Sequence, residues 1–154
     1  MDDAIDARAR TPAHLWIVGA LATLWNGFGA YDYLMTRMRN TDYFEGMMPG
    51  VDPNAMLAWV DAFPLYAQFG WGLGVWGGLL GSLLLLIRSR FAVHLFAASL
   101  VGTILGLGYQ ILAAPPLPPG AESTMGSVMP YVIILVAALL LYYATRQRAN
   151  GVLR

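Results

Sequence analysis

Long apolar runs without charge alternate with short segments that carry the charged residues. Between Arg10 and Asp32 lie 21 residues with no charge other than one that His14 can carry, and 26 uncharged residues separate Asp61 from Arg88. Either run, as a helix rising about 1.5 Å per residue, is long enough to cross about 30 Å of hydrocarbon. We therefore predict membrane-spanning helices over residues 13–34, 64–87, 91–112 and 128–146.

Helices are the expected form of these runs. An unpaired backbone amide in lipid is strongly unfavourable, and the runs lack the polar alternation of a barrel strand. The prolines and glycine between Pro115 and Gly120 interrupt the third uncharged stretch and separate the last two helices. The predicted fold is therefore all-α, a single integral membrane domain over residues 1–154 folded as a four-helix bundle.

Arginines indicate the orientation. Seven lie on one side of the four predicted helices and two on the other, where most acidic side chains outside the helices also lie. By the positive-inside rule, both termini are expected in the cytoplasm, with the chain in a bacterial inner membrane. The first helix is expected to be retained, because it has no convincing small-residue signal-peptide cleavage site. The seven are Arg8, Arg10, Arg88, Arg90, Arg146, Arg148 and Arg154, and the two are Arg37 and Arg39.

The long first external loop has a helical pattern of its own. Asp52 followed by Pro53 is typical of a helix cap and a first-turn proline. Met56, Leu57 and Val60 then recur at helical spacing. Residues 53–62 are therefore predicted to form a short amphipathic helix on the outer membrane surface.

Composition narrows the classes of function. The chain is 58% hydrophobic and 12% charged, with zero formal net charge. Such a chain has no basic field for nucleic acid, so we expect no nucleic-acid partner. Cysteine is absent, which excludes disulfides, thiolate metal sites and cysteine nucleophiles. No phosphate-binding loop, zinc-ligand histidine pair, nucleophile elbow or dinucleotide fingerprint is present, so no enzymatic activity and no cofactor are expected.

Glycines recur every four positions in the second and third predicted helices. This spacing lets helix backbones approach closely in lipid, so the glycines are expected to pack helices within the bundle or between copies of the chain. Lining a substrate path is the alternative. The residues are Gly70, Gly74, Gly77, Gly78, Gly81, Gly102 and Gly106.

One segment recurs after 80 residues. Arg8-x-Arg10-x-x-x-His14-Leu15 returns as Arg88-x-Arg90-x-x-x-His94-Leu95. This echo suggests two helical hairpins in parallel orientation, as in some transporters. Alternatively, the positive-inside rule makes all cytoplasmic helix ends look similar.

A few polar residues fall inside the predicted helices. Asn26 lies near the middle of the first and Asp32 toward its outer end, while Gln68 and Gln110 lie in the second and third. An ionisable group at membrane depth suggests a proton or substrate site. Asp32 could instead pair with Arg37 and Arg39 at the interface, and the amides could simply hydrogen-bond between helices.

The two histidines, His14 and His94, each lie about one turn into a helix entering from the cytoplasm. At equal depth they could hold a haem or contact a quinone, and the alternative is two isolated interfacial side chains.

Methionines other than Met1 all fall on the predicted outer side. Met35, Met38, Met47 and Met48 are candidate ligands for Cu(I), a soft metal that thioethers suit. The alternative is apolar filling of a loop that rests on lipid.

The run from His14 to Asn40, with Leu24-Trp25-Asn26-Gly27-Phe28-Gly29 at its centre, resembles a family of small uncharacterised proteobacterial inner-membrane proteins with four helices. The stretch from Gly74 to Leu86 is also similar to that family, and the similarity covers most of the chain. Some members carry a sugar-transporter label, but the resemblance supplies no binding residues. The chain lacks the Pro-Gln pair of small sugar-transporter repeats, and it has Asn26 where small multidrug exporters have a deep glutamate.

These observations favour a non-enzymatic structural or accessory subunit of the membrane, with the lipid bilayer and either further copies of itself or a larger membrane complex as partners. One alternative is a small secondary transporter of a polar solute that works as an oligomer and uses Asn26 and Asp32. A second alternative is a haem- or quinone-linked redox subunit that uses His14 and His94.

Overall fold

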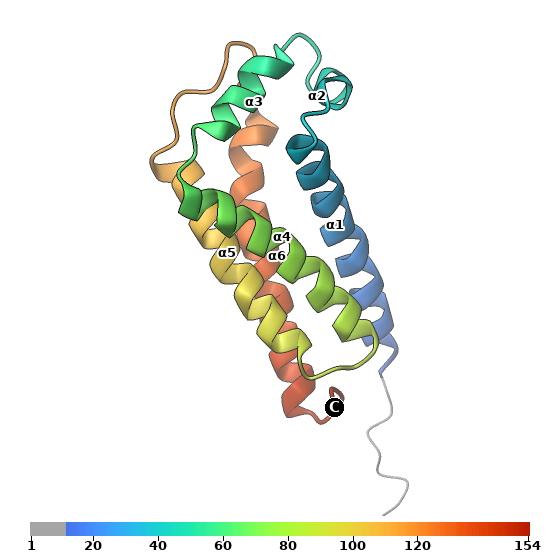
Figure 1. The fold of residues 1–154 in the computed structure, drawn as a ribbon. Coiled ribbons are helices and arrows are strands. Elements are labelled where there is room, and N and C mark those ends of the chain that lie inside the picture. The colour runs from blue at the N-terminus through green and yellow to red at the C-terminus, as the bar shows by residue number, and fades with distance from the viewer. Residues whose placement is uncertain (1–11) are drawn as a thin grey trace, which may run out of the picture.

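The computed structural model describes residues 12–154, which contain helices and loops and no strand. The all-α prediction is therefore confirmed for this range. The long helices α1, α4, α5 and α6 lie side by side, with the short α2 and α3 at one end of them (Figure 1). The helices are α1 (Ala13–Arg37), α2 (Thr41–Met47), α3 (Pro53–Asp61), α4 (Leu65–Leu86), α5 (Ala92–Leu112) and α6 (Thr124–Ala149).

Helices α1 and α5 run in one direction along the bundle, and α4 and α6 run in the other (Figure 1). We call the end with residues 87–91 and 150–154 the turn end, and the end with α2, α3 and residues 113–123 the loop end. At the turn end, the Arg154 amide donates to the Arg88 carbonyl at 2.8 Å, and the Arg90 amide donates to the Arg154 carbonyl at 2.9 Å. The C-terminal residues are thereby tied to the turn between α4 and α5.

Three helices in the described range, α4, α5 and α6, are long and apolar enough to cross a membrane. The chain is therefore a membrane protein by its helices. Helix α1 has 25 residues but is not among the three. His14, Asn26 and Asp32 lower its mean hydropathy, although large apolar side chains such as Leu24 and Phe28 are exposed along it.

The long helices pack in the order α1, α4, α5, α6, and α1 and α6 have no contact of comparable extent. The bundle is therefore an arc that is open between α1 and α6. At the turn end the arc is closed by an apolar core to which all four long helices and the C-terminal tail contribute. This core contains Leu15, Ala22, Leu85, Ala92, Phe96, Leu140, Ala144, Val152 and Leu153.

Glycines bring α4 and α5 together. A Cβ atom on Gly102 would lie 2.5 Å from the Gly74 nitrogen and 2.6 Å from the Gly70 oxygen, and one on Gly106 would lie 3.0 Å from the Trp71 nitrogen. Gly77 faces the Leu95–Ser99 turn of α5, Gly81 faces the Phe96 ring, and Gly78 faces Asn26 of α1. These glycine faces are occupied within one chain, so any contact between copies has to use other surfaces.

A second, smaller core lies at the loop end and is built from α2 and α3. It contains Phe44, Val51, Met56 and Leu57, all buried. The indole nitrogen of Trp59 donates to the Pro115 carbonyl at 2.8 Å, which fastens α3 to the connection between α5 and α6. The α2–α3 segment therefore forms an ordered cover over this end of the bundle.

Some helix bounds differ from the expected ranges. Helix α2 was not predicted; Asn40 caps it by accepting from the Tyr43 amide at 2.9 Å. Helix α6 begins at Thr124 instead of 128, because Ser123 caps it and its first turn is polar and lacks an apolar signal. Helix α1 continues to Arg37, and the expected segment 53–62 corresponds to α3. Arg8 and Arg10, the first part of the expected repeat, lie outside the described residues.

Candidate ligand-binding cavity

A cavity of about 500 Å³ lies inside the arc of long helices. All six helices contribute to its lining, which extends from Met47 and Met56 in the α2–α3 cover to Leu140 in the core of the turn end. A smaller cavity of about 230 Å³ shares Trp59, Gln110 and Pro130 with it. Because α1 and α6 make little contact, the open side of the arc lies beside this space.

The lining is mostly apolar and rich in rings and thioethers. Its large side chains come from every element, so no single helix forms the site. They are Trp25, Phe28, Phe44, Trp59, Phe63, Trp71 and Phe96, together with Met47, Met48, Met56 and Met129.

Within residues 12–154, Asp32 is the one charged residue that lines the cavity. One of its carboxylate oxygens accepts from the Tyr43 hydroxyl at 2.8 Å. The Asp32 backbone carbonyl accepts from the Thr36 hydroxyl at 2.9 Å. The second carboxylate oxygen has no hydrogen-bond donor among residues 12–154, and Asp32 forms part of the cavity lining.

Tyr43 lies on α2, outside the long helices, and holds the cover to α1. Its ring lies edge-on to the Tyr31 ring, with centroids 5.6 Å apart. Burial, the hydrogen bond to Asp32 and the negative charge of Asp32 raise the pKa of Tyr43 well above its usual value. The hydroxyl therefore stays protonated and donates to Asp32.

Asn26 lies deeper in the cavity lining and links two helices. Its amide nitrogen donates to the Ala22 carbonyl at 2.9 Å and to the Ser82 hydroxyl of α4 at 3.0 Å. The Ser82 hydroxyl donates in turn to the Gly78 carbonyl at 2.8 Å. Asn26 thus donates once within α1 and once to α4, and its side-chain oxygen faces Gly78 of α4.

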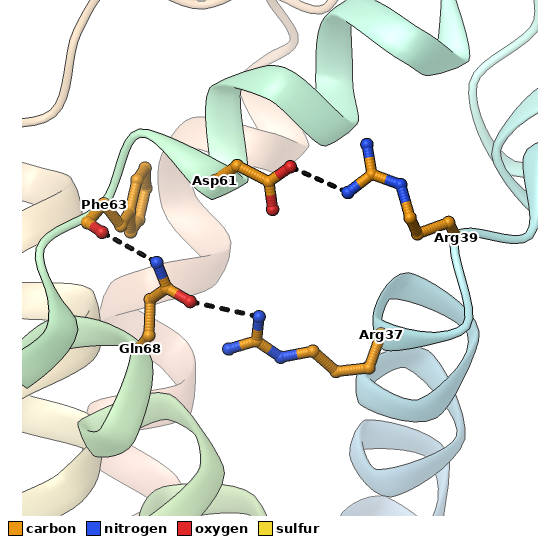
Figure 2. Close-up of polar contacts among 5 residues, drawn as sticks. All are labelled: Arg37, Arg39, Asp61, Phe63 and Gln68. Atoms are coloured by element: carbon orange, nitrogen blue, oxygen red, sulfur yellow. Dashed lines mark hydrogen bonds and ion pairs between the residues drawn. The ribbon is translucent and has the colours of Figure 1, made fainter.

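The two glutamines named from the sequence have different surroundings. Gln110 lines the cavity, and no hydrogen bond of its side chain is found within residues 12–154. Gln68 lies outside the lining, where its nitrogen donates to the Phe63 carbonyl at 2.8 Å and its oxygen accepts from Arg37 at 3.1 Å (Figure 2). Asn26, Asp32 and Gln110 therefore share one cavity, and Gln68 belongs to the contact between α1 and α4.

The expected pairing of Asp32 with nearby arginines does not occur. Arg39 forms a salt bridge with Asp61 of α3 at 2.7 Å, and Arg37 bonds Gln68 (Figure 2). The guanidinium of Arg37 also lies 5.5 Å from the centre of the Trp71 ring. Both arginines therefore join the end of α1 to α3 and α4, and Asp32 forms no salt bridge within the described range.

The histidines lie away from the cavity and have different partners. His14 is hydrogen-bonded through Nδ1 to the Tyr143 hydroxyl at 2.6 Å, which links α1 to α6 near the turn end. His94 packs beside the Phe91 ring, 5.9 Å between centroids. The structure therefore does not bring them together at one site.

The four methionines proposed as copper ligands do not lie together at one site. Met47 and Met48 line the cavity, Met38 is exposed, and the Met35 sulfur accepts from the Asn40 side chain at 3.7 Å. No cluster of three or more His, Asp or Glu side chains suited to a metal lies in residues 12–154.

Two parts of the site were missed in the sequence. Tyr43 lies 11 residues beyond Asp32, past a helix end, and no sequence pattern brings the two together. The aromatic lining comes from helices far apart in sequence, and the one signal that could have pointed to it is the i, i+3 spacing of Trp25 and Phe28 on α1.

The cavity offers apolar surface, one carboxylate and a few hydrogen-bonding groups, which suits binding of a mainly apolar molecule. Among the described lining residues, the Thr36 and Ser99 hydroxyls donate to backbone carbonyls and not to the Asp32 carboxylate. Comparison with known proteins adds no assignment: no protein-family model, curated protein or solved structure matches this chain.

Proposed function

We propose that this chain is a non-enzymatic, multi-pass protein of the bacterial inner membrane that binds a mainly apolar molecule in the cavity between its four long helices. The cavity of about 500 Å³ with its ring- and thioether-rich lining is the observation that carries the proposal. Its volume is within the range of sites that enclose drug-sized molecules, which is about 300–1,000 Å³. A subunit of this kind is an accessory protein that holds or presents a membrane-soluble ligand.

The outer surface of the helices supports a position in lipid. Leu24 on α1 is 72% exposed and Phe69 on α4 is 76% exposed, and Leu135 on α6 is also exposed. A water-soluble domain rarely exposes a continuous apolar surface of this kind, whereas lipid covers it without penalty. On this basis α1 crosses the membrane together with α4, α5 and α6.

Charges support the proposed orientation. Arg88, Arg90 and Arg154 lie together at the turn end, and Arg146 and Arg148 lie in the last turn of α6 at the same end. The loop end carries most of the acidic residues of the described loops. The positive-inside rule then places the turn end in the cytoplasm and the α2–α3 cover outside. A reporter fused after Arg154 should be active in the cytoplasm only, and activity on the outer side would overturn this orientation.

Filling the cavity tests the binding function. Gly29 lines the cavity, and a Cβ atom added there has nothing within 4 Å. Gly29→Leu should therefore occupy ligand space without disturbing the packing. Gly27→Leu on the same helix is a matched control, because Gly27 is equally free of neighbours but does not line the cavity.

The readout is fluorescence of Nile red, a neutral apolar dye, with protein reconstituted in nanodiscs. Saturable binding to the wild type and to Gly27→Leu, with at least about tenfold weaker binding to Gly29→Leu, is the expected result. Equal binding by all three proteins, or no saturable binding at all, would refute the cavity as a ligand site.

Transport is a second candidate, because Asp32 and Asn26 line the same cavity. The apolar lining favours a membrane-soluble substrate over the polar solute suggested by the sequence. Uptake into proteoliposomes that depends on a proton gradient and is lost in Asp32→Asn would support transport, and uptake that is unchanged in this variant would exclude an Asp32-coupled mechanism. The haem- or quinone-linked alternative has no comparable support, since His14 and His94 lie outside the cavity lining.

A further inference from the structure

We propose that the ligand of this cavity is a hydrophobic organic cation, an amine or quaternary ammonium with apolar substituents, whose charge is neutralised by the carboxylate of Asp32. This inference rests on the proposed binding function and specifies its ligand class.

Charge is the first argument. Asp32 is the only charged residue among those lining the cavity, and it forms no salt bridge within residues 12–154. Arg37 and Arg39, which follow Asp32 in the sequence, are held by Gln68 and Asp61. A carboxylate in an apolar space without a counter-ion attracts a cation and repels an anion, because the surroundings screen the charge poorly.

The hydrogen bonds of Asp32 give the second argument. The Tyr43 hydroxyl occupies one carboxylate oxygen at 2.8 Å and fixes the plane of the carboxylate. The second oxygen is left for a ligand, and an ammonium group or the positively charged edge of a quaternary centre fits it. A ligand with an anionic group finds no arginine, lysine or histidine in the part of the lining that the structure describes.

Aromatic rings give the third argument. Trp25 and Phe28 lie on α1 within two turns of Asp32, and Phe44 lines the cavity from α2. The faces of aromatic rings attract cations, most strongly when water is excluded. The same rings bind apolar substituents, so one surface accommodates both parts of the ligand.

The test compares two ions of the same shape and opposite charge, tetraphenylphosphonium and tetraphenylborate, as competitors of Nile red in nanodiscs of neutral lipid. We expect the wild type to bind the phosphonium at least about tenfold more tightly than the borate, after correction for partition into empty nanodiscs. Asp32→Asn should remove this preference, because the amide carries no charge while its oxygen can still accept from Tyr43.

Tyr43→Phe is the matched control. It removes the hydroxyl but keeps the carboxylate charge, so the preference for the cation should remain. Nile red binding with no preference for the phosphonium, or a preference that survives Asp32→Asn, would overturn the cationic assignment and leave the cavity intact as a site. If the wild type shows no saturable binding of Nile red, the proposed function itself is refuted.

The cation can come from two sources, a free hydrophobic amine or the ammonium headgroup of a membrane lipid. Phosphatidylethanolamine added to the nanodiscs distinguishes them. Competition with the phosphonium that is lost in Asp32→Asn would identify a lipid headgroup as the source. Absence of competition would exclude this headgroup and leave a free hydrophobic amine as the proposed ligand.

Discussion

Replacing Gly102 by alanine should separate α4 from α5 and destabilise the fold. The added Cβ would lie 2.5 Å from the Gly74 nitrogen and 2.6 Å from the Gly70 oxygen, both of them backbone atoms that cannot rotate away. Reaching the 3.4 Å of an ordinary van der Waals contact requires the helices to move apart by about 0.9 Å, the difference between 3.4 and 2.5. A gap of about this size forfeits roughly a quarter to a half of the dispersion energy of the affected contacts.

We expect the variant to lose about 1–3 kcal/mol, the usual range for overpacking of a close contact. Gly108→Ala is the matched control on the same helix, because a Cβ at Gly108 has nothing within 4 Å. Alanine favours helix over glycine by up to about 1 kcal/mol, so this control should be neutral or slightly stabilised.

The measurement is reversible unfolding in mixed micelles with increasing SDS, followed by far-ultraviolet circular dichroism and tryptophan fluorescence. The two variants should differ by about 1–4 kcal/mol in the free energy of unfolding, with Gly102→Ala the less stable. If Gly102→Ala is as stable as Gly108→Ala, then α4 and α5 do not meet through these glycines and the packing argument is wrong.

Three further results are expected. The pair between Arg39 and Asp61, whose side chains are 58% and 50% exposed, should show a coupling of less than about 1 kcal/mol in a double-mutant cycle, decreasing with added salt; a larger coupling that resists salt would contradict its surface character. Because burial and Asp32 raise the pKa of Tyr43 above 10.0, the folded state keeps this proton longer than the unfolded state, so stability is complete below about pH 10 and falls as the pH rises further. Tyr43→Phe should reduce that alkaline loss in a pH series of SDS unfolding curves, and an unchanged slope would argue against the contact. Ser123→Ala should cost about 1 kcal/mol at the start of α6, seen as faster hydrogen exchange there, whereas Ser123→Asp should preserve the cap.

The helical class and the apolar character of the long helices could be predicted from the sequence, because long uncharged stretches and the prolines that interrupt them are local signals. Three of those helices, α4 to α6, meet the requirements of a membrane span. Helix α1 does not, since Asn26, Asp32 and its Trp and Tyr side chains reduce its mean hydropathy while its outer face stays apolar.

Single residues of the candidate site could be predicted from the sequence, but their arrangement could not. Asn26, Asp32 and Gln110 could be named as polar residues at membrane depth, but their common cavity depends on an arc that is set by tertiary packing. The partner of Asp32 was unpredictable, because Tyr43 reaches it through the positive φ of Arg39 and the cap at Asn40 that turn the chain into α2. The proposed duplication of two hairpins stays a prediction, since Arg8 and Arg10 of the first copy of the repeated motif lie outside the described residues.

The open side of the arc gives the surrounding bilayer a direct influence on the site. Helix α1 is joined to α6 by the His14 to Tyr143 hydrogen bond at the turn end, and little else holds the two together toward the loop end. Lipid lies where a closed bundle would have contacts between α1 and α6. Lateral pressure and acyl-chain length are therefore expected to affect the separation of these two helices and hence the width of the cavity. We expect ligand affinity to vary with the thickness of the host membrane, and this sensitivity should disappear when a cross-link joins α1 and α6 near the loop end.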